Sequence, residues 1–434
     1  MENELIKHMP NVKKFDNYIT DVKNNISPIM LSGLTDVGKI HFAYATHFYA
    51  KKPIVIITYN EIQAKKIIQD LKFFKDEVIY FPKREIVTYD YLAESKDLLN
   101  DRIEALNEIY KNNAKIIVTT IEAVSQKIIS KENLYKNILE LKVGKKQTQE
   151  ELKEKLVSLG YERYDLVEGK GQFSVRGGIV DIATSSEKGV RLEFFGDEID
   201  SIRYFDISSQ RSIEMLKEIT IYPAYEFVLE KSLEEVVKSI VEEDIEAIKS
   251  GDYINKVDKY FNSFYTKQET LVDYLSEDYI IFLDEVERIK TRIDNIIKNN
   301  KNIISQLTEK EKIVPDGLRN ISDYVQFVEN ILNKQVIYLC KNDLNFIDKK
   351  SMHAKRNGYS FSYREANFFR STMDLLLEEI QKAVRDKKTV IILNENEENR
   401  QAMEMLLKKY YIEHHYVGAG SHTRPNQIMR DIFG

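Results

Sequence analysis

The feature that most constrains this chain is a glycine-lysine loop between an apolar segment and a helical pattern. The loop runs from Gly33 to Ile40 and reads Gly-Leu-Thr-Asp-Val-Gly-Lys-Ile. It keeps the spacing of a phosphate-binding loop up to its last position. A strand is expected before it, at 28–32, and a helix after it, through residue 49. In this context the loop predicts an α/β domain built on a parallel sheet.

The segments that follow have the alternation expected of such a sheet. Short runs rich in Ile and Val predict strands at 53–58, 78–81 and 115–119. Between the first two of these strands, apolar residues at helical spacing predict a helix at 61–74. We therefore assign residues 1–140 to the first part of this domain.

The loop lacks one part of a working nucleotide site. Such a site needs backbone N–H groups for phosphates, a lysine for the β and γ phosphates, and a hydroxyl for magnesium. Gly33, Gly38 and Lys39 can meet the first two requirements, but Ile40 carries no oxygen. Asp36 places a carboxylate where a polyanion would bind, and like charges repel at that distance. The loop is thus either a weakened nucleotide site or a relic turn, and we predict no hydrolysis.

A second fragment fits the same interpretation. An apolar strand expected at 279–283 ends in Asp284 and Glu285. In nucleoside triphosphatases, carboxylates at such a strand end organise magnesium and activate water. The alternative is an ordinary helix start, where carboxylates meet the positive end of the helix dipole. Together with the loop, the pair predicts one ancestral site whose two halves are separated by an insertion.

The pattern changes near residue 142, where a different kind of segment begins. A helix is expected at 148–159, ended by Gly160. After it come four short strands separated by glycine-rich turns. These strands are expected at 172–175, 179–182, 191–195 and 199–205. We interpret residues 141–228 as a small α+β insert.

Three stretches of this insert carry a specific resemblance. Residues 159–165 read Leu-Gly-Tyr-Glu-Arg-Tyr-Asp, and similar matches follow at 171–182 and 191–206. They resemble the UvrA-binding domain shared by the repair helicase UvrB and the transcription-repair coupling factor family. The resemblance implies a helicase-like domain interrupted by this insert.

Two departures from UvrB favour the N-terminal region of the coupling factor family. UvrB has a complete phosphate loop, whereas this chain has Ile40 at its end. UvrB also has a long aromatic hairpin that clamps DNA, and the corresponding stretch here, 81–100, is short. Tyr89 and Tyr91 remain there, and core packing is the interpretation we prefer over base stacking.

The resemblance also implies a set of docking residues for UvrA. Arg163 and Arg176 align with arginines used for that contact, and Lys170 falls where UvrB has a basic residue. Ser174 falls where UvrB has another arginine. The alternative for the two arginines is an intramolecular ion pair with acidic residues of 162–168, since surface ion pairs are common and weak. With the resemblance, we favour docking.

Strand alternation predicts how these side chains are presented. Phe173 and Val175 share one face, and Ser174 shares the other with Arg176, which we expect to be the solvent side. Phe173 is expected in the core. The insert carries more acidic than basic residues, and the whole chain has a formal net charge of −6. It therefore offers no basic field for binding DNA non-specifically, and the few arginines suit ion pairs with a protein.

The remaining segments complete the predicted organisation. We expect the helicase-like domain to resume at 229–330 and an additional α/β domain to follow at 331–434. That last part includes a strand at 335–340, helices at 371–385 and 397–409, and a strand at 389–393. The single cysteine, Cys340, rules out an internal disulfide and is expected to be buried.

The resemblance implies a module that recruits UvrA, with no metal and no cofactor in this region. ATP and magnesium are expected only in a motor further along the full-length protein, which would also contact RNA polymerase and DNA. No apolar run predicts a membrane span and no signal peptide is evident, so a cytoplasmic location is expected. Two alternatives remain: a divergent DNA-dependent ATPase or translocase of the UvrB type, and a docking surface masked by another part of the protein.

Overall fold

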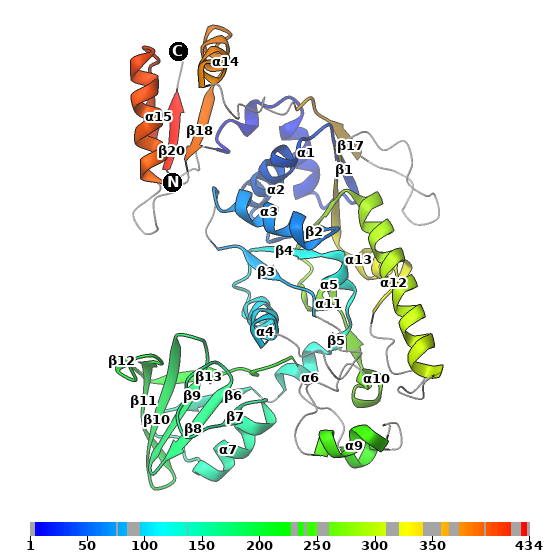
Figure 1. Cartoon of the computed structure of the whole chain (residues 1–434), viewed down its shortest axis with the longest axis vertical. Helices are drawn as coiled ribbons and strands as arrows, with labels where there is room; N and C mark the ends of the chain where they lie inside the picture. Colours follow the sequence, from blue (N-terminus) through cyan, green and yellow to red (C-terminus); the bar gives the residue numbers. More distant parts are fainter. Residues whose placement is uncertain are drawn as a thin grey trace.

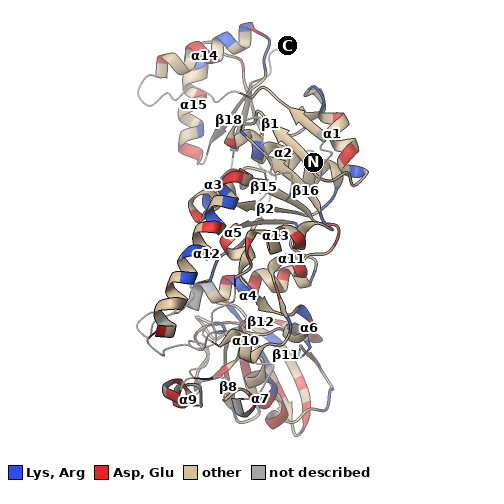
Figure 2. Ribbon diagram, turned by 90° about the vertical axis from the view of Figure 1, so that its right-hand side faces the viewer, with Lys and Arg blue, Asp and Glu red and all other residues tan. Residues whose placement is uncertain are grey.

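The computed structural model of the chain describes most of its residues. These are residues 5–74, 77–84, 96–136, 138–226, 233–237, 240, 242–249, 260–309, 321–341, 357–363, 373–394, 396–417 and 427–431. They form a body around a large sheet, with a β-rich insert at one end and a small unit at the other (Figure 1). Acidic and basic residues are interspersed along the molecule (Figure 2). None of the described helices is both long and apolar enough to span a bilayer.

The body is organised by a seven-stranded sheet with the order β17-β1-β16-β15-β2-β4-β3. All neighbouring strands in it are parallel, which confirms the predicted α/β class. The strands are β1 (Ile29–Ser32), β2 (Ile54–Thr58), β3 (Ile79–Phe81), β4 (Ile116–Thr120), β15 (Ile280–Asp284), β16 (Gln335–Leu339) and β17 (Asn357–Ser360).

Helices cover both faces of this sheet, so its central strands are buried along their whole length. One face packs against α1 (Phe15–Lys23), α2 (Asp36–Ala50) and α3 (Glu61–Leu71). The other face packs against α4 (Lys96–Tyr110), α5 (Ile121–Ser125), α11 (Leu271–Tyr274), α12 (Val286–Glu309) and α13 (Tyr324–Ile331). The long helix α4 was not among the elements expected from the sequence.

The insert is joined to the body by an antiparallel ribbon of β6 (Leu139–Lys142) and β13 (Glu218–Ile221). Between these strands lie the helix α7 (Gln149–Ser158) and a six-stranded sheet with the order β12-β11-β10-β9-β8-β7. Gly160 ends the helix with a left-handed φ of 85°. The strands are β7 (Glu162–Arg163), β8 (Gln172–Arg176), β9 (Ile179–Ala183), β10 (Lys188–Phe195), β11 (Glu198–Asp206) and β12 (Ser212–Leu216).

The last part of the chain corrects the predicted boundary at residue 331. The strands β16 and β17 pair with β15 and β1, so residues through 360 complete the sheet of the body. A separate three-stranded sheet, β18-β20-β19, follows with its own small core. Its elements are α14 (Met373–Arg385), β18 (Val390–Asn394), α15 (Glu397–Lys409), β19 (His415–Val417) and β20 (Gln427–Asp431). Periodicity predicted the strands at 335–340 and 389–393 but not which sheet each one joins. The strands β17, β19 and β20 were not predicted.

Shorter elements connect these parts. They are the 3-10 turn η1 (Met9–Asn11), the strands β5 (Ile128–Ile129) and β14 (Gln268–Glu269), and the helices α6 (Lys131–Tyr135), α8 (Leu233–Val236), α9 (Glu242–Lys249) and α10 (Phe261–Phe264). The prediction for Tyr89 and Tyr91 falls on residues 85–95, outside the described residues.

Candidate functional site

The glycine-lysine loop lies between β1 and α2, as predicted, but the helix begins within the loop rather than after it. It starts at Asp36, so Gly38 and Lys39 belong to its first turn. Thr35 caps the helix, and its side-chain oxygen accepts a hydrogen bond from the Gly38 N–H at 3.1 Å. In a phosphate loop, N–H groups at this position face the ligand. Here one of them is already bonded within the chain.

Lys39 meets the predicted acidic pair at the end of β15. Its Nζ donates to Asp284 Oδ1 at 2.8 Å and also bonds Glu285. Burial alone would lower the pKa of Lys39, but the charges of these two carboxylates raise it above its ordinary value. The side chain of Lys39 is only 2 % exposed. The glycine-lysine loop and the acidic end of β15 therefore come together, and the lysine binds carboxylates of its own chain.

The glycines of the loop are covered by the segment after β17. A Cβ on Gly33 would lie 1.9 Å from the carbonyl oxygen of Phe361, and one on Gly38 would lie 2.8 Å from the ring of Tyr363. The backbone N–H of Tyr363 donates to Gly33 O at 3.0 Å. Because Gly33 and Gly38 have no side chains, Phe361 and Tyr363 can pack directly against the loop.

These residues do not fit magnesium and ATP. Ile40 is buried and offers no ligand oxygen. The N-terminus of α2 already has a carboxylate, because Asp36 lies in its first turn and pairs with Lys66 at 3.0 Å. Burial would raise the pKa of Asp36, but Lys66 lowers it below its ordinary value. A nucleotide would have to displace Tyr363 and break the contacts of Lys39.

The insert presents two of the three predicted docking residues to solvent. Arg163 is exposed on the edge strand β7. Arg176 ends β8, and its side chain is 48 % exposed while its Nη2 donates to Asp181 Oδ2 at 2.7 Å. The intramolecular partner is therefore Asp181, not an acidic residue of 162–168. This pair leaves about half of the Arg176 side chain accessible to a partner.

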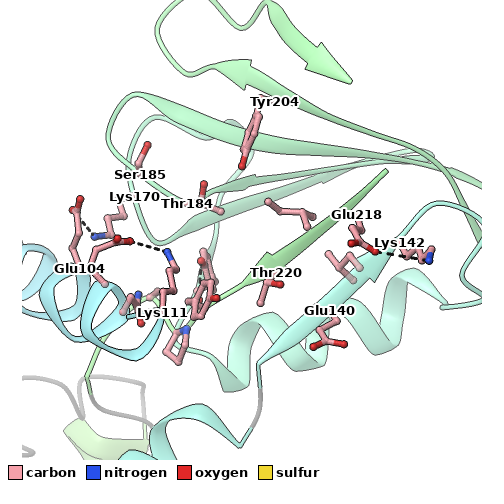
Figure 3. A pocket seen from close by; sticks show the side chains of 18 of the residues that line it. Glu104, Lys111, Glu140, Lys142, Lys170, Thr184, Ser185, Tyr204, Glu218 and Thr220 are labelled. Atoms are coloured by element: carbon pink, nitrogen blue, oxygen red, sulfur yellow. Dashed lines mark hydrogen bonds and ion pairs between the residues drawn. The ribbon is translucent and has the colours of Figure 1, made fainter. Parts of the chain in front are cut away.

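Lys170 lies in a different environment. Its Nζ donates to Asn100 O at 3.1 Å and lies 3.5 Å from Glu104 on α4, and its side chain is 10 % exposed. It lines a cleft of about 800 Å³ between the insert and the body (Figure 3). Burial lowers the pKa of Lys170, and Glu104 opposes that shift only in part. Lys170 thus joins the insert to the body in this structure.

The sheet of the insert confirms one predicted position and corrects another. Phe173 is buried, as expected, but Ser174 is also buried, with 1 % of its surface exposed. Ser174 pairs across the sheet with Asp181, which in turn faces Arg191. The prediction of a solvent-facing Ser174 was wrong because β8 lies inside the sheet, beside the arginines that converge on Asp181.

Sequence reasoning missed an exposed aromatic residue beside Arg176. Phe195, at the end of β10, is 84 % exposed. The hydrogen bond from Phe194 N to Gly178 O, at 2.8 Å, places the β8–β9 and β10–β11 turns side by side. Two successive phenylalanines in a strand point to opposite faces. Because Phe194 packs against the core, the pair itself was the signal that Phe195 faces out.

One face of the six-stranded sheet carries Arg176, Ile179, Arg191, Phe195 and Met215, and we refer to it as the outer sheet face. The cross-strand register places these residues on the side opposite the core residues Val180, Leu192 and Ile202. Met215 is 64 % exposed and adds a further apolar contact surface. A face with exposed apolar side chains and arginines has the composition of a protein interface.

Comparison with known proteins agrees with this geometry. Residues 139–227 match the UvrB interaction domain, close to the predicted insert at 141–228. Over 426 residues the chain is 29 % identical to the transcription-repair-coupling factor of Bacillus subtilis, covering 92 % of this chain. It is 25 % identical over 431 residues to that of Staphylococcus aureus.

The chain is similar to the transcription-repair-coupling factors over most of its length. It spans 36 % of the length of these two coupling factors and corresponds to their N-terminal region. The residues that match the UvrB interaction domain include the exposed Arg163 and Arg176. The glycine-lysine loop, which we call the closed loop because Phe361 and Tyr363 cover its glycines, lies in the body. The similarity to the coupling factors extends over the body as well.

Proposed function

We propose that this chain is a recruitment module that presents its insert to UvrA, the damage-recognition ATPase of nucleotide excision repair. In a longer coupling factor in the cytoplasm, the module would connect RNA polymerase stalled on DNA to the repair machinery. The observation that carries the proposal is the outer sheet face, where Arg176 and Phe195 are both exposed. Arginine and aromatic residues dominate the energetics of protein interfaces.

The body would serve as a scaffold without ATP hydrolysis. Lys39 is held by Asp284 and Glu285, and the glycine positions are filled by Phe361 and Tyr363. The proposed role therefore needs no bound nucleotide or metal. No contact in the described residues favours the alternative of a divergent ATPase.

The test is a binding measurement between purified UvrA and the 434-residue chain. Wild type is compared with Arg176→Glu, and with Arg211→Glu as a control. Arg211 is also exposed on the insert, but it precedes the edge strand β12, which three strands separate from β8. Equal retention of wild type and Arg176→Glu on UvrA would remove the assigned surface. A DNA-stimulated ATPase rate that Lys39→Ala abolishes would favour the alternative.

A further inference from the structure

Asp181 is a charged residue in the middle of the outer sheet face, yet it is fully buried. Its carboxylate lies between two arginines from the neighbouring strands β8 and β10. We propose that Asp181 is a positioning residue, which fixes the guanidinium of Arg176 in the orientation that a carboxylate of UvrA would bind. This inference rests on the proposed function.

The two arginines use the carboxylate differently. Arg191 binds it with two nitrogens, Nε to Oδ1 at 2.6 Å and Nη2 to Oδ2 at 2.9 Å. Arg176 reaches it with Nη2 alone, at 2.7 Å to Oδ2. Bidentate pairing fixes the plane of a guanidinium, whereas a single bond leaves the other N–H groups available. Arg191 therefore anchors Asp181, and Asp181 in turn holds Arg176.

Arg191 is itself held from the side away from Asp181. Its guanidinium carbon lies 4.7 Å from the centre of the Phe205 ring, and its Nη1 lies 3.4 Å from Gln210 O. The side chain of Arg191 is 15 % exposed, against 48 % for Arg176. Arg191 is therefore the fixed and largely buried member of the cluster, Asp181 is fully buried between the two arginines, and Arg176 is the accessible member.

This arrangement has a consequence for binding. A free arginine loses rotamer freedom when a partner fixes it, and that loss weakens association. An arginine already held by a buried carboxylate has lost this freedom before the partner arrives. The excess positive charge of two arginines on one carboxylate also favours an acidic group on the partner.

The experiment is a double-mutant cycle on the affinity of the full chain for UvrA. Asp181→Asn keeps the volume and removes the charge, and we expect it to weaken binding by about tenfold. In an Arg176→Ala background the same change should have no further effect on affinity. Asp200→Asn, an exposed aspartate of β11, is the matched control and should bind like wild type.

A merely structural role would give a different result. If Asp181→Asn weakened binding equally in both backgrounds, or if it bound like wild type while Arg176→Ala did not, the positioning role would be overturned. Failure of wild type to bind UvrA would overturn the proposed function instead. Thermal denaturation of each variant identifies any loss of folding.

A measurement on the unmutated protein covers the case in which Asp181→Asn does not fold. With arginine labelled by ¹⁵N, a guanidinium held by Asp181 should give a resolved, slowly rotating Nη signal in NMR spectra. Arg176→Lys assigns that signal by removing it. A freely rotating Arg176 guanidinium in wild type would contradict the proposal.

Discussion

The closed loop of the body and the outer sheet face of the insert contain the same chemical unit in two settings. In each, a cation is paired with a buried aspartate: Lys39 with Asp284 at 2.8 Å, and Arg176 with Asp181 at 2.7 Å. The lysine is 2 % exposed and the arginine 48 % exposed. The first pair therefore stabilises the fold, whereas the second leaves its cation available to another protein.

This difference shows why an ion pair does not by itself identify a binding site. A cation buried with its partner has its interactions satisfied inside the chain, and separating the pair leaves an uncompensated charge. A half-exposed arginine can keep its internal bond and accept a second carboxylate. Exposure of the cation, rather than the presence of the pair, separates the two regions.

The largest effect is expected from Lys39→Met. This change leaves Asp284 and Glu285 without their cation, and such a loss costs about 3 kcal/mol of the free energy of unfolding. Urea denaturation measures it, and Lys65→Met, on the exposed surface of α3, should change little. The affinity for UvrA should stay at the wild-type value. A stable Lys39→Met protein would show that the loop is not held by this pair.

The next effect concerns the other side of the comparison. Arg176→Glu should weaken UvrA binding by about 30-fold, equivalent to about 2 kcal/mol for a central interfacial arginine. Isothermal titration calorimetry measures the affinity, with Arg211→Glu as the control. Because Arg176 is half exposed, the protein should remain folded. A drop in stability as large as that of Lys39→Met would remove the distinction between the two pairs.

A third prediction concerns the junction between the two regions. Glu226 lies after β13, where the chain returns from the insert to the body. Its carboxylate accepts hydrogen bonds from Arg102 Nε at 2.8 Å and from Arg84 Nη1 at 3.3 Å. Burial would raise the pKa of Glu226, but the charges of Arg102 and Arg84 lower it below its ordinary value. The stabilisation is therefore present above the unfolded-state pKa and is lost as the pH falls through the folded-state pKa.

Glu226→Gln should thus lower the free energy of unfolding by about 1.5 kcal/mol at pH 7. The difference from wild type should shrink below about pH 4.3, the ordinary pKa of a glutamate. Chemical denaturation across this pH range gives the difference. A difference that grew on acidification would contradict the assigned ion pairs.

The smallest effect is expected at Lys170, which the resemblance grouped with the docking arginines. Lys170→Ala removes a contact with Asn100 and Glu104 on α4. Partly exposed pairs of this kind contribute less than about 1 kcal/mol, and UvrA affinity should change by less than about twofold. Hydrogen exchange should increase along α4 and the ribbon of the insert. A loss of affinity comparable to that of Arg176→Glu would show that Lys170 contacts UvrA directly.

The sequence predicted local elements well because local signals determine them. The strand at 179–182 and the helix at 397–409 were predicted within one residue of their observed bounds. Apolar periodicity and glycine turns carry that information. The residue at the last position of the loop, Ile40, is likewise a local signal, and the prediction of a defective nucleotide site rests on it.

The remaining features depend on contacts between distant parts of the chain. The bond between Lys39 and Asp284 joins residues separated by the whole insert. Tyr363, which covers Gly38, lies just after β17, a strand that was not predicted. Burial of Ser174 depends on which strands flank β8. Such contacts follow from sheet order, which periodicity does not specify.

The position of β1 has a consequence for the order in which the chain folds. Its two neighbours in the sheet, β16 and β17, are encoded after the entire insert, since Ile29 pairs with Ile337 and with Asn357. The strands of the insert, in contrast, are contiguous in sequence. Local contacts form faster than distant ones, and domains fold during synthesis from the N-terminal side. On the ribosome, the insert can therefore form its complete sheet before β16 and β17, the strands that pair with β1, have been synthesised.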